Sequence, residues 1–87
     1  MELTVIIVNY NVRQFLENAL TSTLRAMEGL VGEVFVVDNA SDDGSAEMVK
    51  VKFPGVHLIE NTENLGFARA NNMALGRARG RYLLLIN

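Results

Sequence analysis

The stretch LTVIIVNYN (residues 3–11) decides the fold class of this 87-residue chain. Its first six residues are apolar apart from one threonine and are rich in β-branched side chains, a composition typical of a strand that is covered on both faces. Two asparagines around a tyrosine follow, and such residues commonly end a strand. We therefore expect a buried strand over residues 3–8, of the kind found in parallel sheets.

Strand and helix patterns alternate along the rest of the chain. Apolar residues recur at helical spacing over residues 12–27 and 67–78, and a short helix between them must end before Pro54. Further apolar runs predict strands over residues 33–37, 56–59 and 82–86. Alternating strands and helices with short connections imply right-handed crossovers. The sequence therefore predicts an α/β fold, a Rossmann-like parallel sheet of about four strands with helices on both faces.

Composition places the chain among globular proteins and excludes several function classes. Hydrophobic residues make up 49% and charged residues 21%, enough to bury a core, and the length allows one domain only. The net charge of -2 without a broad basic face argues against nucleic-acid binding. No cysteine is present, so neither disulfides nor a zinc–thiolate cluster supports the fold. The start of the chain lacks a signal-peptide pattern, and we expect a cytoplasmic protein.

Polar residues follow each of the four predicted strands. In a parallel sheet these ends meet at one edge, where ligands bind in open α/β folds. The four ends are Asn9-Tyr10-Asn11, Asp38-Asn39, Glu60-Asn61 and Asn87. Asparagine and aspartate are also common turn residues, but four coinciding ends favour a binding site.

The first strand–helix junction contains no glycine, which argues against a dinucleotide fold and against a P-loop. Tyr10 could still stack on a nucleoside base, and Asn9 or Asn11 could hydrogen-bond its edge. For Asn11 the alternative is a helix N-cap with Gln14 three residues later. Both alternatives stay open from the sequence.

Two motifs resemble family 2 glycosyltransferases, which have the GT-A fold. Residues 36–45 (VVDNASDDGS) resemble the acidic D-x-x-S-x-D-G-[ST] segment after the second strand of that family, and residues 64–72 (NLGFARANN) resemble its N-x-G-F-x-x-A-x-N segment. Residues 5–11 and 78–87 complete four blocks in the order of the family. The chain therefore resembles the N-terminal, nucleotide-binding part of a GT-A fold, and within the family it is most similar to bacterial rhamnosyl- and galactosyltransferases.

The resemblance implies roles for several of these residues. Asp38 would accept a hydrogen bond from the nucleotide base, although it could equally be a cap or turn residue. Asp43 would help to shape the pocket, but we favour a helix cap. Gly66 and Asn72 match positions that line the donor site, with a turn glycine and a solvent-facing asparagine as alternatives. Arg69 is assigned to the helix surface rather than to a diphosphate.

The metal site of the family is incomplete in this sequence. Family members carry an Asp-x-Asp or Asn-Pro-Asp element at the end of the fourth strand, and Asn87 matches only its first residue. We therefore expect a divalent metal, Mg or Mn, in the full-length enzyme and not on this chain alone. The family's catalytic base would lie in the C-terminal half, so residues 1–87 are expected to be a single incomplete domain that is inactive by itself. Apolar surface left exposed on its sheet would favour self-association.

The function implied by the resemblance is sugar transfer from a UDP- or dTDP-sugar donor to a saccharide or lipid-linked acceptor. The transfer would be inverting, would serve polysaccharide and cell-surface glycan synthesis, and would occur in the cytoplasm, peripheral to the inner face of the membrane. The alternative function is a non-catalytic α/β module that binds a partner through its apolar edge. A receiver-like phospho-acceptor domain is disfavoured, because Asn9-Tyr10 and Glu60-Asn61 do not supply the acids that it needs.

Overall fold

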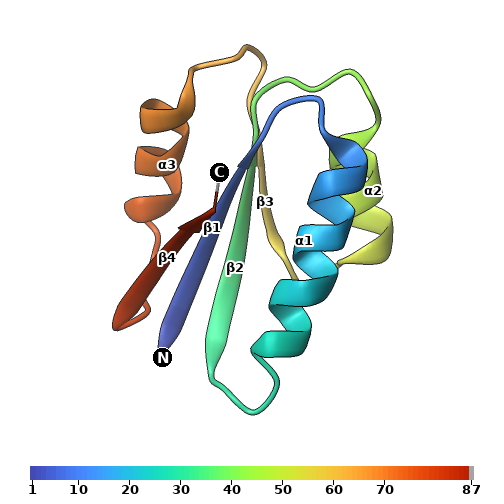
Figure 1. The fold of residues 1–87 in the computed structure, drawn as a ribbon. Helices are drawn as coiled ribbons and strands as arrows, with labels where there is room; N and C mark the ends of the chain where they lie inside the picture. Colours follow the sequence, from blue (N-terminus) through green and yellow to red (C-terminus); the bar gives the residue numbers. More distant parts are fainter. Residues whose placement is uncertain (87) are drawn as a thin grey trace.

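Four parallel strands form one sheet in the order β3-β2-β1-β4 (Figure 1). The structure is a computed structural model that describes residues 1–86. Its strands are β1 (Leu3–Asn9), β2 (Gly32–Asp38), β3 (His57–Glu60) and β4 (Tyr82–Ile86). The helices are α1 (Arg13–Ala26), α2 (Ser45–Lys52) and α3 (Phe67–Leu75). The predicted α/β fold with a four-stranded parallel sheet is confirmed.

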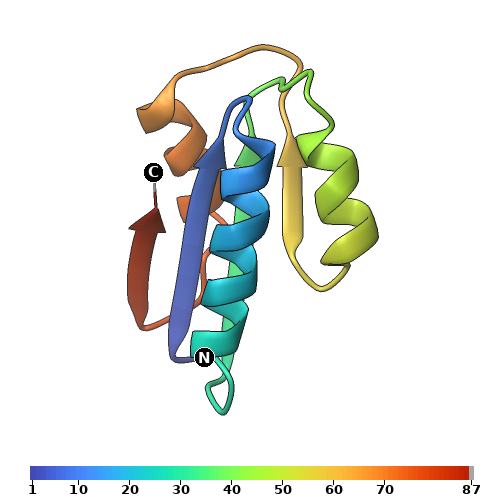
Figure 2. The same ribbon diagram turned by 45° about the vertical axis from the view of Figure 1, so that its right-hand side comes forward.

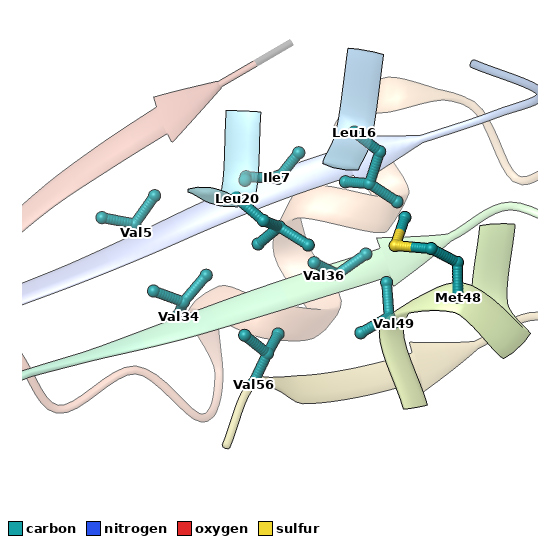
Figure 3. Packing of buried hydrophobic residues seen from close by; sticks show 9 residues of the cluster. All are labelled: Val5, Ile7, Leu16, Leu20, Val34, Val36, Met48, Val49 and Val56. Atoms are coloured by element: carbon teal, nitrogen blue, oxygen red, sulfur yellow. The ribbon is translucent and has the colours of Figure 1, made fainter. Parts of the chain in front are cut away.

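The helices cover both faces of the sheet, as Figure 2 shows, with α1 and α2 on one face and α3 on the other. Successive side chains of a strand point to opposite faces, so the continuous apolar run of β1 feeds two cores. Between the sheet and α1 and α2 lies the larger core, formed by Val5, Ile7, Leu16, Leu20, Val34, Val36, Met48, Val49 and Val56 (Figure 3). Against α3 lies the smaller core, formed by Ile6, Phe35, Val37, Ala70 and Ala74.

The bounds of the elements agree with the sequence patterns within one residue at most ends, but the last helix is shorter than predicted. The apolar pattern indicates a helix to Ala78, whereas α3 ends at Leu75 and Gly76 is its C-cap. The next two residues form turn-type bonds instead, with the N–H of Arg77 donating to Ala74 O at 2.9 Å. The prediction was wrong here because glycine has a low helix propensity, which the regular spacing of the alanines obscures.

Strand β4 forms one edge of the sheet and exposes much of its apolar surface. Leu83, Leu84 and Leu85 are 50%, 48% and 45% exposed. This is the apolar surface that the sequence predicts, and self-association through it stays a prediction. Within residues 1–86, no helix has the length and hydropathy that crossing a membrane requires.

Candidate functional site

The loops that follow β1, β2 and β3 lie together along the carboxyl edge of the sheet, at the top of Figure 1. The chain adds β2 and β3 on one side of β1 and then returns to place β4 on the other side, so the strand order reverses next to β1. Ligands of open α/β sheets bind beside such a reversal. A hollow of about 570 Å³ opens at this edge, lined by Ile7, Val8, Asn9, Tyr10, Val12, Phe15, Asn39, Asn64, Gly66 and Phe67. Its volume suits a small-molecule ligand.

The lining of the hollow combines aromatic rings with amide groups. Tyr10, Phe15 and Phe67 are 51%, 52% and 43% exposed, so their rings are accessible to a planar ligand. Asn9 and Asn39 are buried at the ends of β1 and β2. Of the residues that the sequence assigns to the site, the hollow brings together Asn9, Tyr10 and Gly66.

Asp38 lies beside the hollow rather than in its lining. It is 3% exposed and is the register partner of Asn9 across β1 and β2. Its Oδ1 accepts hydrogen bonds from Asn9 Nδ2 at 2.9 Å and from Ser41 Oγ at 2.7 Å, and its Oδ2 accepts the N–H of Ser41 at 3.0 Å. A carboxylate oxygen can accept two hydrogen bonds, so Oδ2 keeps capacity for one further donor.

Asn11 connects two loops and does not cap a helix. Its N–H donates to Ser41 Oγ at 2.9 Å, and its Oδ1 accepts the N–H of Asp42 at 2.8 Å. The N-cap of α1 is Val12, without a side-chain cap bond, and Gln14 Nε2 donates to Asn18 Oδ1 at 3.1 Å instead. The N-cap alternative for Asn11 is therefore wrong, because its side chain is already engaged by the loop after β2.

Asp43 satisfies the amino ends of two helices. Its Oδ2 accepts the N–H of Arg13, the first residue of α1, at 2.9 Å. Its Oδ1 accepts the N–H of Ser45, the first residue of α2, at 3.0 Å, and also the Ser45 hydroxyl. The Ser45 hydroxyl does most to lower the pKa of Asp43, the backbone N–H groups add to it, and burial acts in the opposite direction. The N-cap of α2 is Gly44, so Asp43 is not itself the N-cap residue, although its carboxylate bonds the first N–H of both helices. A role in shaping a pocket stays a prediction.

The loop before α3 is fixed by an asparagine to which the sequence assigned no role. Asn39 is 2% exposed; its Nδ2 donates to Gly66 O at 3.2 Å and its Oδ1 accepts Asn61 Nδ2 at 2.9 Å. Gly66 has φ +81°, so it is both a turn glycine and part of the lining of the hollow. The available signal for Asn39 was only its place at the end of β2.

Helix α3 places its two asparagines differently. Asn72 is exposed and does not line the hollow, and Arg69 is exposed as expected. Asn71 is 4% exposed, its Nδ2 donates to Phe67 O at 3.1 Å, and its buried Oδ1 has no partner within the described chain. The structure therefore does not bring Asn72 to the site, while its buried neighbour lies one helical turn from Phe67.

The described residues do not fit a divalent metal. Between residues 1 and 86, no three histidine, aspartate or glutamate side chains gather as metal ligands would. Asn87, the sequence-based candidate, lies outside the described residues.

Comparison with known proteins identifies the family. The model of the family described as glycosyl transferase family 2 matches residues 4–87. The chain belongs to this family. Its curated relatives include the succinoglycan biosynthesis protein ExoO of Rhizobium meliloti (strain 1021), 34% identical over 99% of this chain. Another is the putative teichuronic acid biosynthesis glycosyltransferase TuaG of Bacillus subtilis (strain 168), 32% identical over 97% of it.

Solved structures share the fold of this family 2 chain. The mannosyltransferase PcManGT from Pyrobaculum calidifontis, in complex with GDP-Man and Mn2+, superposes with a TM-score of 0.79 at 33% identity over 94% of this chain. S. aureus TarS 1-349 superposes with a TM-score of 0.83 at 26% identity over 99% of it. The chain spans 25% of ExoO, 34% of TuaG, 26% of the PcManGT chain and 27% of the TarS chain, so it corresponds to the N-terminal portion of a family 2 glycosyltransferase.

Proposed function

We propose that this chain forms the nucleoside-binding part of a nucleotide-sugar donor site in a glycosyltransferase of polysaccharide and cell-surface glycan synthesis. The observation that carries the proposal is the hollow at the carboxyl edge, where exposed aromatic rings lie next to buried amides and a carboxylate with spare acceptor capacity. A nucleoside base presents two apolar faces and a polar edge, which match these two kinds of group. PcManGT, a structural relative at 33% identity, was solved with a nucleotide sugar.

The proposed roles follow from the contacts of each residue. The exposed ring of Tyr10 stacks on the base, with Phe67 on the same hollow. Asp38 accepts an imino N–H of the base through the free capacity of Oδ2, because its Oδ1 is occupied by Asn9 and Ser41. Uracil and thymine carry such a donor at N3 and guanine carries one at N1, whereas cytosine and adenine do not. The acceptor therefore favours the proposed UDP- or dTDP-sugar over a CDP- or ADP-sugar, and the GDP arm of the titration below tests guanine. Asn72 and Asp43 are given no such role, because Asn72 is exposed on α3 outside the lining and the Asp43 carboxylate bonds the first N–H groups of α1 and α2.

The rest of the reaction is assigned to the remainder of a longer enzyme. We propose inverting transfer to a saccharide or lipid-linked acceptor, with a catalytic base outside residues 1–87. A divalent metal in that enzyme would neutralise the leaving diphosphate. Within residues 1–86 no three carboxylate or imidazole side chains gather, so the ligands of such a metal would come from outside these residues. We propose that the enzyme acts in the cytoplasm, peripheral to the membrane, since a lipid-linked acceptor would lie at the membrane surface.

The experiment that tests the proposal is a titration of UDP, dTDP and GDP into the purified chain, followed by calorimetry with and without Mn²⁺. We expect saturable binding of UDP or dTDP that does not depend on the metal. The variant Asp38→Ala should weaken it by about tenfold or more, because a hydrogen bond to a charged group contributes about 1.5–3 kcal/mol.

The matched control is Asp42→Ala, which removes an exposed carboxylate from the same loop. Its affinity should stay close to that of the wild type. If the chain is folded and binds none of the three nucleotides, the proposed site is wrong. If Asp42→Ala weakens binding as much as Asp38→Ala, the loop contributes its charge rather than a specific contact.

A second candidate function is the non-catalytic module that binds a partner through its apolar edge. The exposed leucines of β4 are the observation in its favour. The same titration separates the two functions, because only the donor site requires a nucleotide to bind.

A further inference from the structure

The hydroxyl of Ser41 joins the loop after β1 to the loop after β2. Its Oγ donates to Asp38 Oδ1 at 2.7 Å, accepts the N–H of Asn11 at 2.9 Å, and accepts Asn9 Nδ2 at 3.3 Å. A serine hydroxyl has one donor and two acceptor sites, so all three are used within the protein. Ser41 therefore has no capacity left to bind a ligand, and its effect on the site must be indirect.

The two loops that Ser41 joins both contain a left-handed residue. Asn11 has φ +51° and Ala40 has φ +62°, and these are the non-glycine residues with positive φ that occur within residues 1–86. Such conformations are costly for residues with a Cβ and persist where the surrounding contacts hold them. Both residues lie next to contacts of Ser41: Asn11 donates its N–H to the hydroxyl, and Ala40 directly precedes Ser41.

The bond from Asn11 acts on the backbone next to Tyr10, a residue that lines the hollow. Its N–H belongs to the peptide bond between Tyr10 and Asn11, so holding this group fixes the backbone directly after Tyr10. A second bond, from the N–H of Asp42 to Asn11 Oδ1 at 2.8 Å, holds the other side of the same residue. The ring of Tyr10 is half exposed, so the surrounding protein does not enclose it.

We infer that Ser41 is a positioning residue for Tyr10: its hydroxyl fixes the Tyr10–Asn11 peptide bond and thereby orients the aromatic ring toward the hollow. The inference rests on the proposed function for its consequence, which is that Ser41 controls nucleoside affinity without touching the nucleoside. The claim that Ser41 orients the Tyr10 ring concerns the free chain and is tested without any ligand.

The first test measures the free chain by NMR in the wild type, Ser41→Ala and Ser41→Thr. In Ser41→Ala the amide of Asn11 should exchange with solvent about tenfold faster, since one hydrogen bond is lost, and the Tyr10 ring should lose its NOEs to other residues that line the hollow. Ser41→Thr keeps the hydroxyl and should restore both. The control Ser22→Ala makes the same chemical change at an exposed position of α1, and it should alter neither the exchange of the Asn11 amide nor the NOEs of the Tyr10 ring. Unchanged exchange and ring contacts in a folded Ser41→Ala variant would overturn the inference.

The second test is a double-mutant cycle on UDP and dTDP affinity with Ser41→Ala and Tyr10→Ala. Each single variant should weaken binding by about tenfold, because base–aromatic stacking contributes about 1–3 kcal/mol. The double variant should lose clearly less affinity than the product of the two single losses, since Ser41 acts largely through the ring and only the remainder comes from its bond to Asp38. Losses that multiply to about a hundredfold would overturn the inference. If wild type binds no nucleotide, the proposed function fails, and the NMR measurements still decide whether Ser41 positions Tyr10.

Discussion

Strand β2 carries a buried carboxylate near each end, Glu33 at the amino edge of the sheet and Asp38 at the carboxyl edge. The two differ by an odd number of positions, so they point to opposite faces, Asp38 toward α1 and α2 and Glu33 toward α3. Asp38 is held beside a hollow by the Asn9 side chain at the end of β1 and by Ser41 in the loop after β2. Glu33 is held by a neighbouring strand and by the connection that leads into β4.

The contacts of Glu33 are those of a structural residue. Its Oε2 accepts the Thr4 hydroxyl at 2.8 Å and the N–H of Arg79 at 2.7 Å, and Thr4 Oγ1 in turn accepts the N–H of Gly80 at 2.9 Å. Its Oε1 lies 3.8 Å from Arg79 Nη2 and 4.0 Å from His57 Nε2. These bonds join β1, β2 and the segment before β4. Burial of a carboxylate is therefore no sign of a binding role. Both acids bond to β1 and to one connecting segment, and they differ in that Asp38 lies at the carboxyl edge beside the hollow.

The largest expected effect is the loss of stability in Glu33→Ala. The change leaves the Thr4 hydroxyl and the N–H of Arg79 without their charged acceptor, and we expect the free energy of unfolding to fall by roughly 2–3 kcal/mol. Nucleotide affinity of the folded fraction should not change. Denaturant unfolding measures the first and calorimetry the second. The control Glu47→Ala removes an exposed glutamate of α2 and should cost less than about 0.5 kcal/mol. Equal effects of both variants would show that the network around Glu33 contributes little.

A smaller effect on stability, combined with a loss of binding, is expected for Asp38→Asn. The new amide keeps the shape but turns an N–H donor either toward the N–H of Ser41 or toward the donors that now bond Oδ1. One unsatisfied contact of this kind costs about 1–2 kcal/mol, and affinity for UDP or dTDP should fall about tenfold. Unfolding and binding measured on the same sample test both parts. A variant that loses stability but keeps its affinity would make Asp38 a structural residue like Glu33.

The fold could be predicted from the sequence because its signals are local. Apolar runs identified the strands, helical spacing identified α1 and α3, and Pro54 bounded α2. Polar residues at strand ends identified the carboxyl edge with Asn9 and Tyr10, and the family resemblance identified Gly66. The error at Gly76 has the same origin, since a regular alanine pattern continued past a residue that ends the helix. The strands and helices, which depend on the local spacing of residues, were thus predicted.

The contacts of the site could not be predicted, because they join residues about thirty positions apart. Ser41 bonds Asn9 and Asn11, and Asp43 bonds Arg13, only because β1 and β2 pair in one particular register. The sequence also allowed a local role for Asn11, an N-cap with Gln14. In the structure its side chain instead accepts the N–H of Asp42, which is distant in sequence. The structural role of Glu33 could not be predicted for the same reason, since its partner Arg79 lies 46 positions away.

A pH titration sharpens the difference between the two edges further. Burial alone would raise the pKa of Glu33, but the N–H of Arg79 and the Thr4 hydroxyl, with the charges of Arg79 and His57, hold it below its ordinary value of 4.5. The stabilisation by the Glu33 carboxylate is thus fully present above the unfolded pKa and is lost as the pH falls through the lower folded pKa.

The free energy of unfolding of the wild type should therefore decline below about pH 4.5. Glu33→Gln, which cannot titrate, should decline less over the same interval. Asp43 adds a decline in the same direction in both proteins, so the difference between them isolates Glu33. Parallel curves would contradict the assignment.

The smallest expected effect concerns the backbone of the carboxyl edge. Ala40 has φ +62°, a conformation that costs a residue with a Cβ about 1–2 kcal/mol and costs glycine almost nothing. The greater freedom of glycine in the unfolded chain offsets part of this relief, so Ala40→Gly should raise the free energy of unfolding by about 0.5 kcal/mol. The control Ala46→Gly lies inside α2 and should lower it by up to about 1 kcal/mol. Opposite signs for the same substitution would show that the loop contacts of Ser41 hold Ala40 against its own preference. A loss of stability in both variants would mean that the left-handed conformation at Ala40 carries no strain.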